Sequence, residues 1–120
     1  MVLIDTSVWI NHLRKGSALL DSLLQNSAVL IHPFVISELA CGNLHNRSRI
    51  LNLLGNLPAG RVADDREVLF FIEHNKLMGR GIGYVDAHLL ASVSLSNSSC
   101  LWTVDRKLKD VATTLGIAKV

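Results

Sequence analysis

The sequence predicts an α/β domain in which a mostly parallel central sheet lies between two layers of helices. Short apolar runs, such as residues 2–4 and 100–104, do not alternate with polar residues, which is typical of strands covered on both faces. Segments with apolar residues at helical spacing, such as 17–26, lie between these runs. The length suits a single domain, expected to span residues 1–120, that buries roughly two-thirds of the surface of its unfolded chain.

Strands and helices are expected to alternate along the whole chain. Strands are predicted at residues 2–4, 28–31, 61–63 and 100–104, with a further edge strand at 117–120. Helices are predicted at residues 6–14, 17–26, 34–41, 47–54, 84–95 and 106–115, and one more begins after Asp64 and Asp65. These two acids are interpreted as helix caps, because acids at a helix start favour the macrodipole. Residues 79–83 are predicted to form a loop, since their glycines match neither the dinucleotide nor the phosphate-loop spacing.

The composition leaves room for protein partners but gives no general signal for nucleic acid. Charged residues make up 18% of the chain, below the roughly 25% of an average soluble domain. Apolar surface is therefore expected to remain for a second copy, as in a homodimer, or for another protein. The net charge is only +2, so RNA binding would need the fold to gather basic residues. The basic clusters are Arg14 with Lys15, Arg47 with Arg49, Arg80, and Arg106 with Lys107 and Lys109. Of these residues, the candidates for RNA binding are Arg14, Lys15, Arg80, Arg106 and Lys107.

The sequence favours a cytoplasmic location without a membrane segment. No apolar run approaches the roughly 18 residues that a bilayer span needs. Asp5 interrupts the first apolar run, which therefore does not resemble a signal peptide. Cys41 and Cys100 lack metal-ligand spacing and are interpreted as reduced core residues.

Four acidic residues occupy positions that a parallel sheet would bring together. Asp5 and Asp105 end predicted strands, Glu38 lies inside a predicted helix, and Asp86 lies on the buried side of the first turn of another. Ligands of open α/β sheets bind at the carboxyl ends of the strands. Two carboxylates about 5 Å apart repel by roughly 3 kcal/mol, so such a cluster must take up protons or bind cations. Oxygen ligands without histidine or cysteine select Mg²⁺ or Mn²⁺, ions that activate water and polarise phosphoryl groups.

Each acid also has a purely structural interpretation. Asp5, Asp86 and Asp105 could be helix N-caps, and Glu38 could be a partly exposed helix residue. The five histidines share no ligand spacing and are assigned surface or packing roles rather than zinc binding. Trp9 and Trp102 fall among apolar neighbours and are expected in the core rather than as base-stacking platforms.

Taken together, the acidic motifs resemble those of a known family. They are Asp5-Thr6-Ser7, Ser37-Glu38-Leu39, Asp86-Ala87 with Ala91-Ser92, and Thr103-Val104-Asp105. In order and in intervening elements they resemble the motifs of PIN-domain ribonucleases, over residues 2 to about 110. The compact length and the amino-terminal motif are most similar to VapC-type toxins of bacterial toxin–antitoxin pairs.

The resemblance implies a PIN-like three-layer sandwich and metal-dependent endonucleolytic cleavage of RNA that leaves a 5′-phosphate and a 3′-hydroxyl. It implies that Asp5, Glu38, Asp86 and Asp105 form the catalytic site. Within that set, Asp5, Asp86 and Asp105 would coordinate Mg²⁺ or Mn²⁺, and Glu38 would coordinate the ion or position water. A toxin of this type would also bind a cognate antitoxin.

The resemblance further implies that hydroxyl groups of Thr6 or Ser7, and of Thr103, orient the acids. One departure is visible, because some relatives carry another acid where this chain has Arg106 and Lys107. That difference puts a second tightly held metal ion in doubt. It also places positive charge where an RNA backbone could dock.

Competing functions come from other classes. A phosphotransfer domain or signalling receiver would use an aspartyl nucleophile, but the acid pair that such chemistry needs is missing, since Ser7 follows where a second aspartate is expected. The stronger alternative is a protein-binding module of the same fold with an inactive or weak metal site. Mg²⁺ binding and its loss on Asp5→Asn would discriminate between the two.

Overall fold

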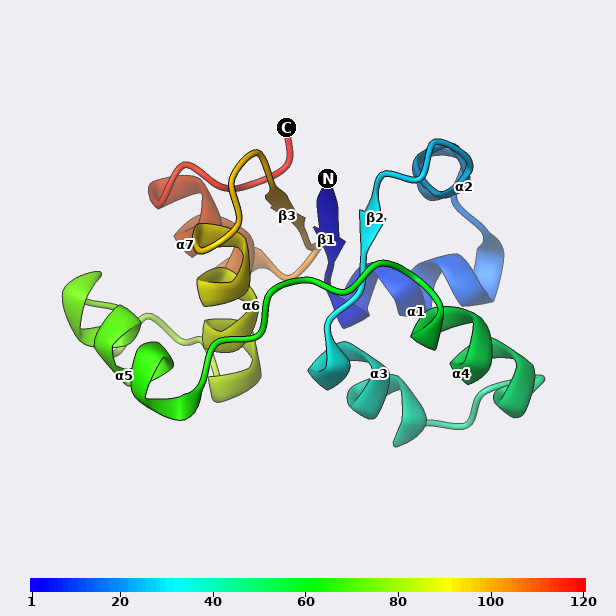
Figure 1. The fold of residues 1–120 in the computed structure, drawn as a ribbon, viewed down its shortest axis with the longest axis horizontal. Helices are drawn as coiled ribbons and strands as arrows, with labels where there is room; N and C mark the ends of the chain where they lie inside the picture. The colour runs from blue at the N-terminus through cyan, green and yellow to red at the C-terminus, as the bar shows by residue number, and fades with distance from the viewer.

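The computed structural model describes residues 1–120, which form a three-stranded sheet and seven helices (Figure 1). The strands are β1 (Val2–Ile4), β2 (Val29–Leu30) and β3 (Cys100–Trp102). The helices are α1 (Thr6–Lys15), α2 (Ala18–Gln25), α3 (Pro33–Ala40), α4 (Arg47–Gly55), α5 (Asp65–His74), α6 (Tyr84–Ser94) and α7 (Arg106–Thr114). None of these helices combines the length and the hydrophobicity that a membrane span requires.

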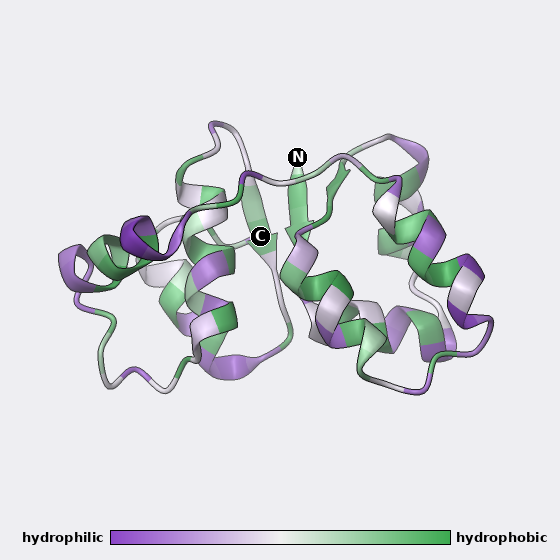
Figure 2. Cartoon of the chain, turned by 60° about the horizontal axis from the view of Figure 1, so that its bottom comes forward, coloured by the Kyte–Doolittle hydropathy of each residue, from purple (hydrophilic) through white to green (hydrophobic).

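The central strand of the sheet is β1, and the strand order is β2-β1-β3. Both strand pairs are parallel, with Leu3 opposite Leu30 on one side and opposite Leu101 on the other. All three residues of β1 are buried. Figure 2 shows the strands as hydrophobic throughout, whereas the helices mix hydrophobic and hydrophilic residues. The predicted parallel sheet, recognised from its non-alternating apolar runs, is confirmed.

Helices cover the sheet from both sides, so the predicted three-layer architecture is also confirmed. Figure 1 shows α5, α6 and α7 on one side of the strands and α1 to α4 on the other. The main core is a cluster of 19 buried residues that includes all of β1. A second cluster joins α5 to α6 through Ala63, Val68, Ala87 and Ala91. Helix α6 also packs against β3.

Two predicted strands are wrong. Residues 61–63 pair with nothing, and the chain instead touches the sheet edge at a single parallel bridge between Ile31 and Ala59. It then leaves the edge because Ala63 is buried under α5. At residues 117–120 the expected edge strand is reduced to one parallel bridge between Leu101 and Ala118.

The predicted core position is wrong for Cys41, whereas Cys100 and Trp102 are partly buried against the core and Trp9 lies within it. Cys41 is exposed, because it is the C-cap of α3, where the chain turns away from the core. Cys100 is only half-buried. Trp9 is 3% exposed and lies in the core, whereas Trp102 is half-buried at the edge of the sheet.

Candidate functional site

The carboxyl ends of β1 and β3 place Asp5 beside Thr103. Asp5 follows β1, and its N–H donates to the carbonyl of Trp102, the last residue of β3. This parallel pairing continues one residue beyond the ladder. The segment 103–105 therefore lies next to the first turn of α1, as the sequence motifs at the two strand ends require.

Asp5 is a buried carboxylate held by two hydroxyl groups. Its side chain is at the N-cap position of α1 but makes no capping hydrogen bond, so the alternative interpretation of Asp5 as a cap is wrong. Instead, Oδ2 accepts from Ser7 Oγ at 2.7 Å and from Thr103 Oγ1 at 2.7 Å. Asp5 is 6% exposed. Burying a charged group costs free energy, and such burial is expected where the charge serves a functional site.

The two hydroxyls also fix the chain around Asp105. Ser7 Oγ accepts the N–H of Val104 at 3.2 Å, and Thr103 Oγ1 accepts the N–H of Asp105 at 3.0 Å. Each hydroxyl therefore donates to the buried carboxylate of Asp5 and accepts from the segment that follows β3. This reciprocal arrangement ties the two strand ends together.

Glu38 reaches the site from the other flank. It lies on α3 and is exposed, and its Oε1 accepts from Thr6 Oγ1 at 2.6 Å. The expectation that Thr6 or Ser7 orients an acid is thus met by both residues in different ways, because Thr6 bonds to Glu38 and Ser7 bonds to Asp5.

Asp105 and Asp86 each make one helix-capping contact. Asp105 is the N-cap of α7, and its Oδ1 accepts the N–H of Leu108 at 3.0 Å. Asp86, in the first turn of α6, accepts the N–H of Gly83 through Oδ2 at 3.2 Å. The capping interpretation is confirmed for Asp105, and Asp86 contributes a reciprocal contact of the same kind. Capping uses only one of the two carboxylate oxygens in each case.

Electrostatics links the four acids. Burial raises the pKa of the Asp86 carboxyl above its ordinary value, and the negative charges of Asp5, Asp105 and Glu38 raise it further. The hydrogen bond from Gly83 acts in the opposite direction. None of the ion pairs in the structure involves any of the four acids. The negative charges of the other three acids therefore all act on Asp86.

The donor chemistry suits a hard divalent cation. In every one of the four carboxylates, one oxygen accepts a hydrogen bond from the protein and the other oxygen accepts none. The free oxygens are Asp5 Oδ1, Glu38 Oε2, Asp86 Oδ1 and Asp105 Oδ2. As they stand, no three acidic, histidine or cysteine side chains are arranged to hold a metal ion together. The residues thus fit Mg²⁺ or Mn²⁺ in ligand type, and binding would have to draw the side chains closer.

The expected basic residues lie at separate places around the acids. Arg14 lines a groove of about 480 Å³ together with Glu38. Lys15 is exposed at the end of α1. Arg80 is half-buried and pairs with Asp110 at 3.8 Å. The two remaining candidates, Arg106 and Lys107, are exposed in the first turn of α7, directly after Asp105.

The sequence did not predict that two histidines near the site, His32 and His88, are buried as a pair. His32 is the N-cap of α3, and its Nδ1 accepts the N–H of Phe34 at 3.1 Å. Its ring centroid lies 6.1 Å from that of His88 on α6, and both side chains are buried. Burial lowers the pKa of His32 to about 4, and the neighbouring His88 acts in the same direction. The predicted packing role of these two residues is confirmed. The sequence signal was His32-Pro33 directly after a strand, a typical helix start.

Comparison with known proteins identifies the family. Residues 2–113 match the family model described as "PIN domain". The chain belongs to the PIN domain family. This PIN-domain chain is 46% identical over 118 residues to "Ribonuclease VapC32" of Mycobacterium tuberculosis strain CDC 1551 / Oshkosh, covering 98% of this chain and 95% of that protein. The protein of the same name from strain ATCC 25618 / H37Rv matches to the same extent.

These matches confirm the resemblance to PIN-domain proteins of the VapC type that the motifs suggested. The PIN match also spans all four acidic positions, from Asp5 to Asp105. Dependence on a divalent metal ion is a general property of PIN-domain ribonucleases of this type.

Proposed function

We propose that this protein is a Mg²⁺- or Mn²⁺-dependent endoribonuclease that cleaves RNA phosphodiester bonds, and that it acts as the toxin of a toxin–antitoxin pair. The observation that supports the proposal is that the negative charges of Asp5, Glu38 and Asp105, from three other segments of the chain, all raise the pKa of Asp86. The similarity to proteins named ribonucleases supports the choice of RNA as substrate.

The four acids would divide the work according to their contacts. Asp5, Asp86 and Asp105 would hold the metal ion through Oδ1, Oδ1 and Oδ2, the oxygens that make no hydrogen bond to the protein. Glu38, more exposed and held by Thr6, would complete the coordination or position the attacking water through Oε2. A bound divalent ion supplies activation of water and charge stabilisation at the phosphoryl oxygens.

The hydroxyl groups would keep the acids aligned. Ser7 and Thr103 each donate to Asp5 Oδ2, and these two bonds fix the direction of Oδ1. Outer contacts of this kind orient metal ligands in many proteins. Thr6 would do the same for Glu38.

Basic residues around the acids would bind the RNA backbone. Arg106 and Lys107 lie at the start of α7, next to Asp105, and Arg14 shares a groove with Glu38. Arg80 would contribute less, because it already pairs with Asp110. Lys15, at the end of α1, would contact only a longer RNA. Phosphate contacts of this type supply affinity without sequence preference.

Protein partners and a cellular location are also part of the proposed function. We propose that residues 1–120 act as one domain, in the cytoplasm where its RNA substrate would be found, and that the protein binds a cognate antitoxin and a second copy of itself. Large hydrophobic side chains that are more than half exposed, such as Leu53, Leu69 and Phe70, support the existence of protein-binding surfaces.

Cleavage of RNA by the purified protein tests the activity. We expect cleavage in Mn²⁺ or Mg²⁺ that EDTA stops, and its loss in Asp5→Asn and in Asp86→Asn. Asp105→Asn should also abolish cleavage but keep the melting temperature, because an asparagine oxygen can still cap α7 at Leu108. Asp64→Asn, which changes an acid at the start of α5 outside the site, is the matched control.

Cleavage that persists in both Asp5→Asn and Asp86→Asn would contradict the assignment. If the protein binds no Mg²⁺ and Asp5→Asn changes nothing, the alternative of a protein-binding module is favoured. The toxin role predicts growth arrest on expression, relieved by a small protein encoded in the adjacent gene.

A further inference from the structure

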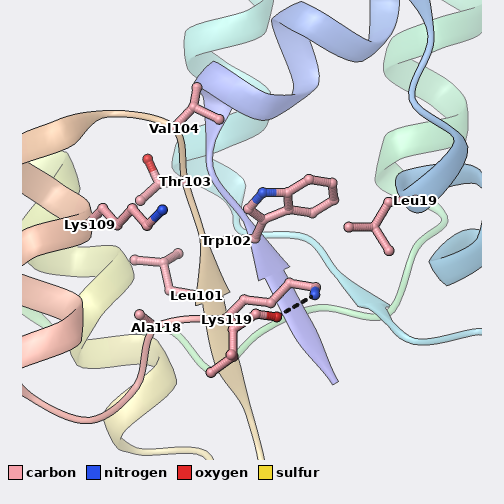
Figure 3. A pocket seen from close by; sticks show the side chains of 9 residues that line it. Leu19, Leu101, Trp102, Thr103, Val104, Lys109, Ala118 and Lys119 are labelled. Carbon is pink, nitrogen blue, oxygen red and sulfur yellow. Dashed lines mark hydrogen bonds between the residues drawn. The ribbon is translucent and has the colours of Figure 1, made fainter.

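A groove beside the acidic site is lined by an aromatic ring and two lysines. It runs between β3, α7, α2 and the segment after α7, with a cavity volume of about 340 Å³. Its lining includes Leu19, Trp102, Thr103, Lys109 and Lys119. Figure 3 shows the ammonium groups of Lys109 and Lys119 turned toward the space beside the Trp102 indole, with Leu19 on the far side of the ring.

Trp102 differs from the other tryptophan of the chain. Trp9 is 3% exposed and closed into the core, whereas Trp102 is half-buried and forms a wall of the groove. One face of its ring is approached by a cation, because Lys119 Nζ lies 5.8 Å from the ring centroid. A half-buried indole that no other aromatic ring covers offers a flat apolar surface of the size of a nucleobase.

The charged side chains of the groove have one sign. They are those of Lys109 and Lys119, and no acidic side chain lines the groove. Neither lysine takes part in an ion pair. Lys119 Nζ donates to a main-chain oxygen of Val120, the last residue of the chain, at 3.2 Å. Two cations that flank an indole and form no ion pair with an acidic side chain favour an anionic ligand with a flat ring.

The groove is joined to the acidic site by Thr103. This residue lines the groove, and its Oγ1 donates to Asp5 Oδ2 at 2.7 Å. Lys109 lies one helical turn after Asp105, to whose carbonyl its N–H donates at 2.9 Å. Trp102 and Asp105 are only three residues apart. The backbone positions of these two residues are therefore within about 10 Å of each other.

We propose that this groove binds one nucleotide of the single-stranded RNA next to the bond that is cleaved. The base stacks on the indole of Trp102, and Lys109 and Lys119 contact the adjoining phosphates. Channels that bind single-stranded nucleic acid combine the same two features, an aromatic platform and a basic groove. The inference rests on the proposed ribonuclease function for the identity of the ligand, and it revises the sequence-based expectation that Trp102 is only a core residue.

Fluorescence of Trp102 provides a direct test. The chain has two tryptophans, so a Trp9→Phe variant leaves Trp102 as the only reporter. Combined with Asp5→Asn and EDTA, this variant binds RNA without cleaving it. We expect a six-nucleotide oligoadenylate to quench the fluorescence, and an abasic oligomer of the same length and charge to bind more weakly and quench less.

Substitutions in the groove give the second readout, using labelled RNA and fluorescence anisotropy. Trp102→Leu should weaken binding by about 5- to 150-fold, the range measured for loss of one stacked base, and Trp102→Phe should retain most of the affinity. Lys119→Gln should reduce the salt dependence of binding by roughly 0.7 in the slope of log K against log salt. Lys76→Gln, which changes an exposed lysine outside the groove, is the matched control and should leave the slope unchanged.

The outcomes separate this proposal from the ribonuclease function. If the protein cleaves RNA but oligoadenylate and its abasic form bind and quench equally, the groove proposal is overturned and the nuclease function stands. If a hexaglutamate peptide quenches Trp102 as strongly as RNA, the groove takes acidic peptides and the proposal is likewise overturned. If RNA quenches as predicted while no cleavage occurs with Mn²⁺, the groove proposal is supported and the nuclease function fails.

Discussion

At the scale of single residues, Thr103 connects the buried carboxylate to the rest of the acidic cluster. Its one hydroxyl proton is donated to Asp5, and its oxygen accepts the N–H of Asp105. The contact of 3.3 Å between Thr103 Oγ1 and Ser7 Oγ therefore involves no proton, since Ser7 also donates to Asp5. Both hydroxyls serve one carboxylate oxygen, so neither can be lost without loosening Asp5.

Thr103→Val tests this role because valine keeps the shape and removes the hydroxyl. We expect RNA cleavage to fall by about 10- to 100-fold, as for other groups that orient metal ligands. The unpaired N–H of Asp105 should also cost about 1 to 3 kcal/mol of the free energy of unfolding. Rates are compared below the melting temperature of the variant, and Thr103→Ser should retain most activity. Cleavage by Thr103→Val within twofold of the unsubstituted protein would show that the hydroxyl does not position Asp5.

His32 makes the stability of the fold depend on pH. The pKa of His32 falls from 6.5 to about 4 in the folded protein because the ring is buried and faces His88. Between these pH values the unfolded chain binds more protons than the folded one. The contribution of neutral His32 to the free energy of unfolding is therefore complete above pH 6.5 and is lost as the pH falls toward 4. A shift of this size corresponds to roughly 3 kcal/mol.

Urea unfolding at pH 7, 5.5 and 4.5 measures this effect. His32→Asn removes the titrating ring, and asparagine can still accept the N–H of Phe34 at the start of α3. We expect the free energy of unfolding to fall more steeply with decreasing pH in the unsubstituted protein than in His32→Asn. Parallel pH profiles would rule out His32 as the source.

At the scale of elements, α7 holds the loop that leads into α6. Arg80 in this loop pairs with Asp110 of α7 at 3.8 Å. Gly81 has φ +80°, and a Cβ built there would lie 2.7 Å from Cδ of Lys107. The aliphatic chain of Lys107 thus passes over the backbone of Gly81. The loop ends at Gly83, whose N–H donates to Asp86. These contacts therefore fix both the cation of Lys107 and the candidate metal ligand Asp86.

Gly81→Ala and Gly79→Ala form a matched pair of variants. Gly79 has φ +74° and nothing near its missing Cβ, so both alanines meet the same backbone strain, about 1 to 2 kcal/mol. Only the alanine at 81 displaces Lys107. We expect similar losses of stability but weaker RNA binding and a smaller salt dependence for Gly81→Ala alone, measured in the Asp5→Asn background. Equal RNA binding by the two variants would exclude Lys107 as a phosphate contact.

The helix starts explain why capping patterns alone do not identify this site. Asp64 and Asp105 both cap helices, and Asp64 forms a full capping box with Glu67. The difference lies in the surroundings. Asp105 belongs to the group of charges that raises the pKa of Asp86, whereas Asp64 does not. The cap contacts are local in sequence, but the electrostatic coupling depends on which elements the sheet brings together.

At the scale of the whole molecule, the parallel sheet gathers the acids. The strand order β2-β1-β3 was not predicted, yet the rule that parallel strands end at one edge was enough to place Asp5 and Asp105 close together. The apolar runs of the strands and the spacing within the helices could be read from the sequence because both are local patterns. Glu38 and Asp86 could be proposed from the motifs, and their proximity depends on how α3 and α6 pack.

Features that depend on packing against distant segments could not be predicted. Whether residues 61–63 pair with the sheet depends on how far the pairing that begins at Ile31 and Ala59 continues along the chain. The exposure of Cys41 follows from the turn after α3, and the half-burial of Trp102 follows from the gap between β3 and α2. The partition of Thr6 and Ser7 between Glu38 and Asp5 depends on where α3 lies relative to α1.

The central claim is that four acids from four elements form one metal site, and isothermal titration with Mn²⁺ tests it most directly. The account predicts binding to the unsubstituted protein and to Asp64→Asn, with binding lost or strongly weakened in Asp5→Asn and Asp86→Asn. Absence of binding to the unsubstituted protein, or equal binding to Asp86→Asn and Asp64→Asn, would contradict it.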